Sequence, residues 1–151
     1  MFDKNNKEIK TGDVVRVSGG YFKSDNGLYY VEHSPGDPSW CGSDHSLHKL
    51  NKNGTLSKAK YNVCFWPISI TTNSWEKRAL AREHNKQFAE IEIIDGFDKT
   101  EIIKHFEEEA KGMDWEIERA WYNYGEESEC YKLPVRIKEF YLDVAKRLVE
   151  E

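Results

Sequence analysis

Hydrophobic residues gather in short runs over the first 70 residues of the chain. Residues 14–17 are rich in valine, residues 28–31 combine a leucine, two tyrosines and a valine, and the segment between them is rich in glycine, aspartate and asparagine. β-Branched and aromatic side chains favour strands, whereas glycine and asparagine favour tight turns. The stretch 11–31 therefore predicts strand, turn and strand, a pattern with which a small β-barrel can begin.

Three further segments of this half extend the pattern. Residues 2–10 predict a tight hairpin, because their two asparagines tolerate the left-handed backbone conformation. Residues 45–58 predict a hairpin with its turn at 51–54, and residues 61–68 predict a strand that ends at Pro67. About five strands before residue 70 are typical of an SH3-like barrel.

The spacing of hydrophobic residues becomes mainly helical beyond residue 70. Capping-box patterns predict helices over 73–87 and 98–111, and Gly112 predicts the end of the second helix. Alternating hydrophobic residues predict strands over 89–94 and 114–123, with continuation of the first helix as the alternative for 89–94. A last helix is predicted from Pro134, because hydrophobic side chains follow it at helical spacing.

These elements predict an α+β fold with two regions. Residues 1–70 form the SH3-like barrel, and residues 71–151 form an acidic α/β region with about three helices and two strands. With 151 residues the chain is short enough for the two regions to share one core.

Two short stretches resemble known families. Residues 3–15 read Asp-Lys-Asn-Asn-Lys-Glu-Ile-Lys-Thr-Gly-Asp-Val-Val, which resembles the opening of small barrels in phage and prophage proteins, the YopX type among them. Residues 20–27 resemble a KOW motif, the hairpin of SH3-like barrels in ribosomal and transcription-elongation proteins, with Ser24 in place of its middle glycine. The first resemblance implies a mobile-element origin, and the second implies a barrel that can bind RNA.

Charge is divided unevenly along the chain. Residues 1–75 hold nine Lys and Arg against seven Asp and Glu, a net of +2, whereas residues 76–151 hold thirteen against twenty, a net of −7. The acidic half repels phosphates, which argues against general nucleic-acid binding by the whole molecule. We expect it to face a basic protein partner instead.

Cysteine content and hydropathy indicate a cytoplasmic location, and the resemblance to phage proteins implies that the cell is a bacterial host. Three widely spaced cysteines without a C-x-x-C pair favour reduced thiols over a disulfide framework. The first residues lack an apolar signal core, and no run approaches the ~20 apolar residues of a membrane-spanning helix. The sequence leaves the oligomeric state open.

Potential metal ligands gather between residues 33 and 48. They are His33, Asp37, Cys41, His45 and His48. His45 and His48 stand three apart on a predicted strand, so their side chains point to opposite faces, and no second ligand pair with zinc-type spacing accompanies them. The sequence therefore predicts no metal site and no cofactor, and a metal-dependent enzyme that uses this region is the third of three hypotheses for function.

Aromatic and acidic residues are the better candidates for binding. Tyr21, Phe22, Lys23 and Tyr29 on the hairpin, with Trp40 in the long loop 32–44, can provide aromatic contacts to a base or to a protein. The acidic candidates lie in the second region: Glu107, Glu108, Glu126, Glu127 and Glu129.

The leading hypothesis is a non-enzymatic phage or mobile-element accessory protein that binds a basic protein partner through its acidic surface. An inhibitor of a host nucleic-acid-handling enzyme, of the anti-CRISPR kind, is one concrete form. The alternative is a KOW-like module that binds RNA or DNA through the barrel.

Overall fold

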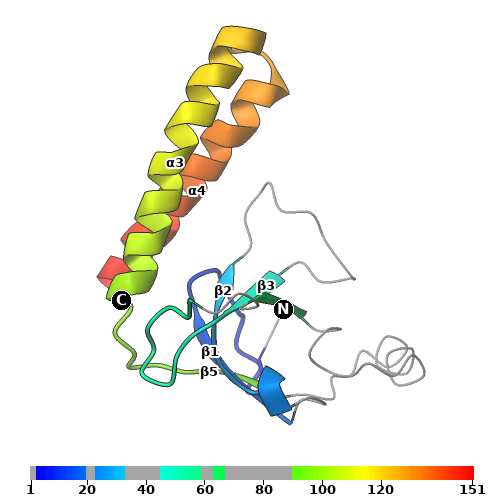
Figure 1. Ribbon diagram of the computed structural model, residues 1–151, viewed down its shortest axis with the longest axis vertical. Helices are drawn as coiled ribbons and strands as arrows, with labels where there is room; N and C mark the ends of the chain where they lie inside the picture. The colour runs from blue at the N-terminus through cyan, green and yellow to red at the C-terminus, as the bar shows by residue number, and fades with distance from the viewer. Residues whose placement is uncertain (1–2, 20–22, 33–44, 59–62, 67–89) are drawn as a thin grey trace, which may run out of the picture. The chain divides into compact units, whose positions relative to one another are not determined.

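The computed structural model describes residues 3–19, 23–32, 45–58, 63–66 and 90–151 (Figure 1). The chain forms two compact units. One contains a β-sheet, and the other contains two long helices.

The sheet has five antiparallel strands in the order β4-β3-β2-β1-β5. The strands are β1 (Val14–Ser18), β2 (Gly27–Glu32), β3 (His45–Lys49), β4 (Val63–Trp66) and β5 (Glu90–Ile93). A 3-10 turn, η1 (Lys23–Asp25), precedes β2. Gly27, the first residue of β2, has a φ of 143°, a backbone conformation that would be strained for a residue with a side chain. The strands predicted over 14–17, 28–31, 61–68 and 89–94 are thus confirmed in type.

One face of the sheet carries the core of this unit. Val15 of β1 stands opposite Tyr29 of β2 on one side and Ile93 of β5 on the other. Val31 faces Leu47 across β2 and β3 in the same way. These side chains belong to one buried cluster, because residues two apart on a strand point to the same face.

Tight turns are present in both predicted hairpins, 2–10 and 45–58. Leu50 and Leu56 form a β-bridge, and Gly54 between them has a φ of 86°. Asn6 has a φ of 62° in the turn that follows Asp3, as expected of asparagine in a tight turn.

The Asp3 carboxylate joins this N-terminal turn to β5. It accepts hydrogen bonds from the backbone N–H groups of Asn5 and Lys7, both at 2.9 Å, and of Ile93 at 3.0 Å. Burial alone would raise the pKa of Asp3, but these three hydrogen bonds and the nearby Lys7 charge hold it below its usual value. The Lys4 N–H also donates to the Ile91 carbonyl at 2.8 Å, so the turn lies along the outer edge of β5.

The predicted closed SH3-like barrel is wrong. In the part of the chain that the structure describes, the sheet is open, with β4 and β5 at its two edges. Closure would require β4 to pair with β5, but among the described residues β4 pairs only with β3 and β5 pairs only with β1 as strand neighbours. The fifth strand comes from residues 90–93, outside the segment from which the barrel was predicted.

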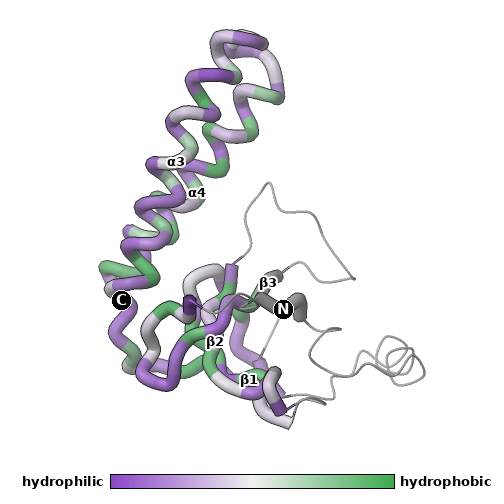
Figure 2. Tube along the Cα trace, in the orientation of Figure 1, coloured by the Kyte–Doolittle hydropathy of each residue, from purple (hydrophilic) through white to green (hydrophobic). Residues whose placement is uncertain are grey.

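The second unit is an antiparallel helical hairpin of α3 (Thr100–Tyr124) and α4 (Glu129–Glu150) (Figure 1). Hydrophobic residues recur along both helices among mainly hydrophilic ones (Figure 2). The buried residues of α3 are Ile102, Phe106, Ala110 and Ala120, and those of α4 are Pro134, Tyr141, Val144, Ala145 and Leu148. At about 100° per residue each set lies within about 100° of its helix circumference, which is one stripe and the pattern of two helices packed side by side.

Specific polar contacts define the ends of the hairpin. The Ser128 side chain caps α4 by accepting a hydrogen bond from the Cys130 N–H at 3.2 Å. Gly125, with a φ of 80°, ends α3. At the other end, Lys99 Nζ lies 3.1 Å from a carboxylate oxygen of Glu151.

The predicted acidic α/β region of about three helices and two strands is also wrong. Residues 114–123, predicted as a strand, lie within α3, and α3 does not end at Gly112. The buried stripe runs on through Ala120, so packing against α4 outweighs the cost of about 1 kcal/mol for a glycine inside a helix. The strand predicted over 89–94 belongs to the sheet of the first unit.

The other two predicted helices have separate outcomes. The helix predicted over 73–87 lies outside the described residues. The last helix is confirmed, but it starts at Glu129, so Pro134 lies inside it and not in its first turn.

Candidate protein-docking surface

The outer face of α3 presents an aromatic surface to solvent. Five side chains line a shallow hollow of about 330 Å³ on this helix: Trp115, Glu118, Arg119, Tyr122 and Asn123. They stand at positions i, i+3, i+4, i+7 and i+8, which is one face of a helix. At about 100° per residue, Trp115 and Tyr122 lie about 180° and 160° around the helix axis from buried Phe106. This second stripe therefore faces away from α4.

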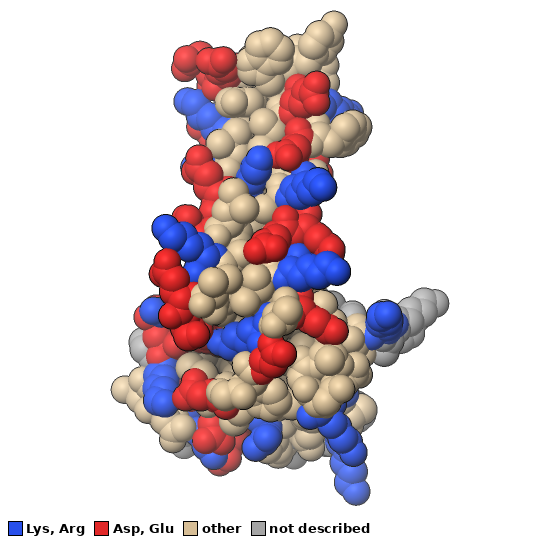
Figure 3. Space-filling model, turned by 90° about the vertical axis from the view of Figure 1, so that its left-hand side faces the viewer, with Lys and Arg blue, Asp and Glu red and all other residues tan. Residues whose placement is uncertain are grey.

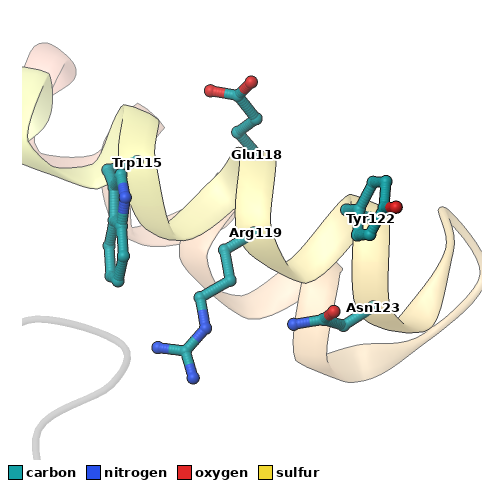
Figure 4. Close-up of a pocket in the computed structure, with 5 residues that line it drawn as sticks. All are labelled: Trp115, Glu118, Arg119, Tyr122 and Asn123. Atoms are coloured by element: carbon teal, nitrogen blue, oxygen red, sulfur yellow. The ribbon is translucent and has the colours of Figure 1, made fainter.

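The five side chains form two parallel rows (Figure 4). Trp115, Arg119 and Asn123 extend to one side of the helix, and Glu118 and Tyr122 extend to the other. Each row follows the i, i+4 direction, and rows of this kind are the ridges that interdigitate when helices pack. The hollow between them is a groove of the shape that another chain can enter.

The exposure of the two rings is unusual for a folded domain. Trp115 is 65% exposed and Tyr122 is 84% exposed. Two more aromatic side chains near the end of α3 are exposed as well, Trp121 and Tyr124. Isolated exposed hydrophobic residues are normal, but several large aromatic residues together mark an interaction surface.

A cation already lies on this aromatic surface. The Arg119 guanidinium carbon is 5.3 Å from the centroid of the Trp115 ring, within the range of a cation–π interaction. Arg119 is also the only basic residue in the sequence between Lys111 and Lys132. The surface thus accepts a guanidinium group in an otherwise acidic segment.

Carboxylates surround the aromatic residues. Residues 112–129, which we call the acidic tip, hold six Asp and Glu against one Arg, a net charge of −5. Figure 3 shows acidic side chains beside uncharged ones at the end of the hairpin where α3 leads into α4. The whole hairpin, residues 99–151, holds fourteen acidic against nine basic residues, also a net of −5, so the acidic tip accounts for the excess.

Half of these carboxylates have partners. Asp114 pairs with Lys138, Glu129 lies 3.1 Å from Arg136, and Glu126 accepts a hydrogen bond from Trp121 Nε1 at 3.3 Å. Among the described residues the other three have no ion-pair or hydrogen-bond partner; they are Glu116, Glu118 and Glu127. These three can bind a cation from another molecule without breaking an internal contact.

The acidic residues singled out from the sequence are all on this hairpin. Glu126, Glu127 and Glu129 lie in the acidic tip and are exposed. Glu107 and Glu108 are exposed in the first half of α3, outside the tip.

The aromatic candidates of the first unit are placed differently. Tyr29 is 3% exposed and belongs to the core of the sheet, with Lys49 Nζ 5.9 Å from its ring centroid. Lys23 is exposed in η1. Tyr21, Phe22 and Trp40 lie outside the described residues.

The potential metal ligands are only partly described. His48 Nε2 lies 3.4 Å from a carboxylate oxygen of Glu32, and its ring stacks on Tyr30 with the centroids 4.8 Å apart. His45 begins β3, and His33, Asp37 and Cys41 lie outside the described residues. Within the described part of the chain, no three His, Cys, Asp or Glu side chains gather in a way that could hold a metal ion. Nor does any described helix have the length and apolar character needed to cross a membrane.

Sequence reasoning missed the exposed aromatic stripe because it assigned residues 114–123 to a strand. The available signal was a second helical spacing beside the core stripe: Trp115, Glu118 and Tyr122 recur at three and four residues, out of phase with Ala110 and Ala120.

Neither a family model, nor a curated protein, nor a solved structure matches this chain.

Proposed function

We propose that this chain is a non-enzymatic protein-binding factor and that the acidic tip is its docking surface. The observation that carries the proposal is the exposure of Trp115 and Tyr122, two turns apart on the outer face of α3. Tyrosine and tryptophan are enriched among the residues that dominate binding energy at protein interfaces. A tryptophan left 65% exposed on a long helix gains its burial from a partner.

The charge of the surface favours a basic partner. With a net charge of −5 over 18 residues, the tip attracts cationic surfaces and repels phosphates. Nucleic-acid-handling enzymes carry basic surfaces for the phosphate backbone. We therefore propose an inhibitor or accessory factor of such an enzyme, in which the acidic tip competes for the surface that nucleic acid would use.

A capture experiment tests this function. The full chain, tagged at one end, is incubated with a bacterial host lysate in parallel with two variants: Trp115→Ala with Tyr122→Ala, and Leu142→Ala as the matched control. Leu142 is also exposed, at 45%, but lies on α4 outside the tip. Circular dichroism confirms that each variant keeps its helical content.

We expect at least one basic protein to be retained by the natural chain and by Leu142→Ala and lost from the double variant. Quantitative mass spectrometry of the captured fraction measures this difference. If every captured protein is retained equally by all three forms, the acidic tip is not a docking surface and the proposal is wrong.

A further inference from the structure

The Arg119–Trp115 contact indicates what kind of group the acidic tip binds. A guanidinium lies over the indole ring at 5.3 Å, supplied by the same helix one turn later. Three carboxylates without a partner among the described residues surround it in the sequence: Glu116, Glu118 and Glu127. An aromatic face next to a free carboxylate is the environment that arginine prefers, because its planar group can stack and donate hydrogen bonds at the same time.

A second position of the same kind lies across the groove. Tyr122 is 84% exposed, and Glu118, one turn earlier, extends to the same side of α3 (Figure 4). No cation of this chain is recorded over the Tyr122 ring among the described residues. The groove therefore offers two aromatic positions: Trp115, which Arg119 occupies, and Tyr122 beside Glu118, which is open.

From this we infer that the acidic tip binds an arginine-rich segment of the partner, and that Arg119 holds the place of a partner guanidinium on Trp115 in the unbound protein. The inference rests on the proposed function and specifies its partner. One incoming arginine stacks on Tyr122 and pairs with Glu118, and a second displaces Arg119 from Trp115.

Other occupants fit the surface less well. A second copy of this chain would bring together two hairpins of net charge −5 each. An acidic peptide could pair with Arg119 but would meet the carboxylates around it, and juxtaposed like charges disfavour binding. A lysine-rich segment supplies the charge, but its compact, strongly hydrated ammonium cannot stack on a ring as a guanidinium does.

Fluorescence anisotropy of labelled peptides tests the inference on the full chain. The probes are an oligoarginine, an oligolysine of the same length and an oligoglutamate. The protein forms are the natural chain, Trp115→Ala, Arg119→Gln, Glu118→Gln and, as a matched control for the loss of one carboxylate, Glu139→Gln on α4. Glu139 is exposed and lies outside the tip.

The expected results differ in sign between variants. Oligoarginine binds more tightly than oligolysine, and Trp115→Ala weakens its binding by about tenfold, as loss of an aromatic anchor does. Arg119→Gln tightens it by about two- to fivefold, because the competing intramolecular cation–π contact is removed. Glu118→Gln weakens it by up to about fivefold, the scale of an exposed ion pair, and Glu139→Gln leaves it unchanged.

Any of the following outcomes would overturn the inference. Equal affinity for oligoarginine and oligolysine with no effect of Trp115→Ala means nonspecific attraction by net charge. Weaker binding of oligoarginine by Arg119→Gln means that Arg119 does not compete with an incoming guanidinium. Preferential binding of oligoglutamate by the natural chain means that Arg119 itself contacts an acidic partner. Concentration-dependent self-association in sedimentation velocity that Trp115→Ala abolishes means that the occupant is a second copy. If oligoarginine fails to bind while capture from the lysate still depends on Trp115 and Tyr122, the proposed function stands and only the partner's chemistry is wrong.

Discussion

Replacing Asp3 by alanine should loosen the outer edge of the sheet 90 residues further along the chain. The Asp3 carboxylate accepts three backbone hydrogen bonds, one of them from Ile93 in β5 at 3.0 Å. The side chain that supplies this acceptor is 7% exposed, so water does not simply take its place. The substitution removes one small side chain and leaves three N–H donors without their acceptor.

The magnitude follows from where these donors lie. The N–H groups of Asn5 and Lys7 belong to exposed residues and can turn to water, at a cost of about 0.5–1 kcal/mol each. The N–H of half-buried Ile93 loses a charged acceptor, which costs about 1–1.5 kcal/mol. The sum is about 2–3.5 kcal/mol in the free energy that opens β5, or faster amide exchange there by at least about thirtyfold.

Hydrogen–deuterium exchange read by mass spectrometry measures this directly. Peptides that cover β5 should exchange faster in Asp3→Ala, while peptides that cover α4 serve as the internal reference because they belong to the other compact unit. Asp95→Ala is the matched control, because it removes an exposed carboxylate two residues after β5. It should change the free energy that opens β5 by less than about 0.5 kcal/mol. If Asp3→Ala and Asp95→Ala gave the same exchange in β5, the reasoning about the Asp3 carboxylate would be refuted.

Acidification should remove the same stabilisation without a mutation. Because the pKa of folded Asp3 is below its ordinary value of 3.8, the folded state favours the ionised carboxylate. Its contribution is therefore complete above that value and is lost as the pH falls through the folded pKa. The difference between the natural chain and Asp3→Ala should shrink below about pH 4, after correction for the intrinsic pH dependence of exchange.

Two further predictions concern packing and the backbone. Phe106→Ala should lower the free energy of unfolding of the hairpin by about 3–5 kcal/mol, since Phe106 is fully buried and stacks on Tyr141 with the ring centroids 5.8 Å apart. Thermal unfolding followed by circular dichroism measures this change. A decrease of less than about 1 kcal/mol would contradict the placement of Phe106 in the core. Glycine-to-alanine substitutions should have opposite signs at two sites, measured by urea unfolding. Gly112→Ala should stabilise α3 by up to about 1 kcal/mol, because its added Cβ meets no atom within 4 Å. Gly54→Ala should destabilise the sheet unit, because the Gly54 φ is 86° and the added Cβ would lie 2.8 Å from the Phe97 ring. The same sign at both sites would contradict the local geometry.

Local sequence patterns were sufficient to predict most strands, but not whether the sheet closes into a barrel. β-Branched and aromatic side chains identified β1 and β2, although β2 is buried on both faces, and the asparagine and glycine turns supported the pairing between neighbours. The β1–β5 pairing was not predictable in this way, since it joins residues more than 70 apart in the chain and depends on competition among strands. A closed barrel and an open sheet share the same strand pattern until the last partner is known.

The helical hairpin shows a different limit. Trp115, Ile117 and Trp121 share a strand-like parity, and Gly112 resembles a helix end, so local signals favoured a strand where α3 continues. Packing against α4 decided the outcome. Three of the six acidic residues of the tip, Glu126, Glu127 and Glu129, were singled out from charge alone. The aromatic groove needed the helix, because only helical geometry brings Trp115 and Tyr122 to one face.

The position of β5 beside β1 has a consequence for how the sheet is assembled. The first four strands can pair with their neighbours in order, but β1 keeps one open side until residues 90–93 are present. An open strand edge is a template for pairing with other chains, and closing so long a loop is slow compared with forming a hairpin. During synthesis, and in any fragment that stops before Glu90, the valine-rich β1 is therefore the point at which two copies would aggregate. Fragments intended for crystallography or for binding assays should extend through β5.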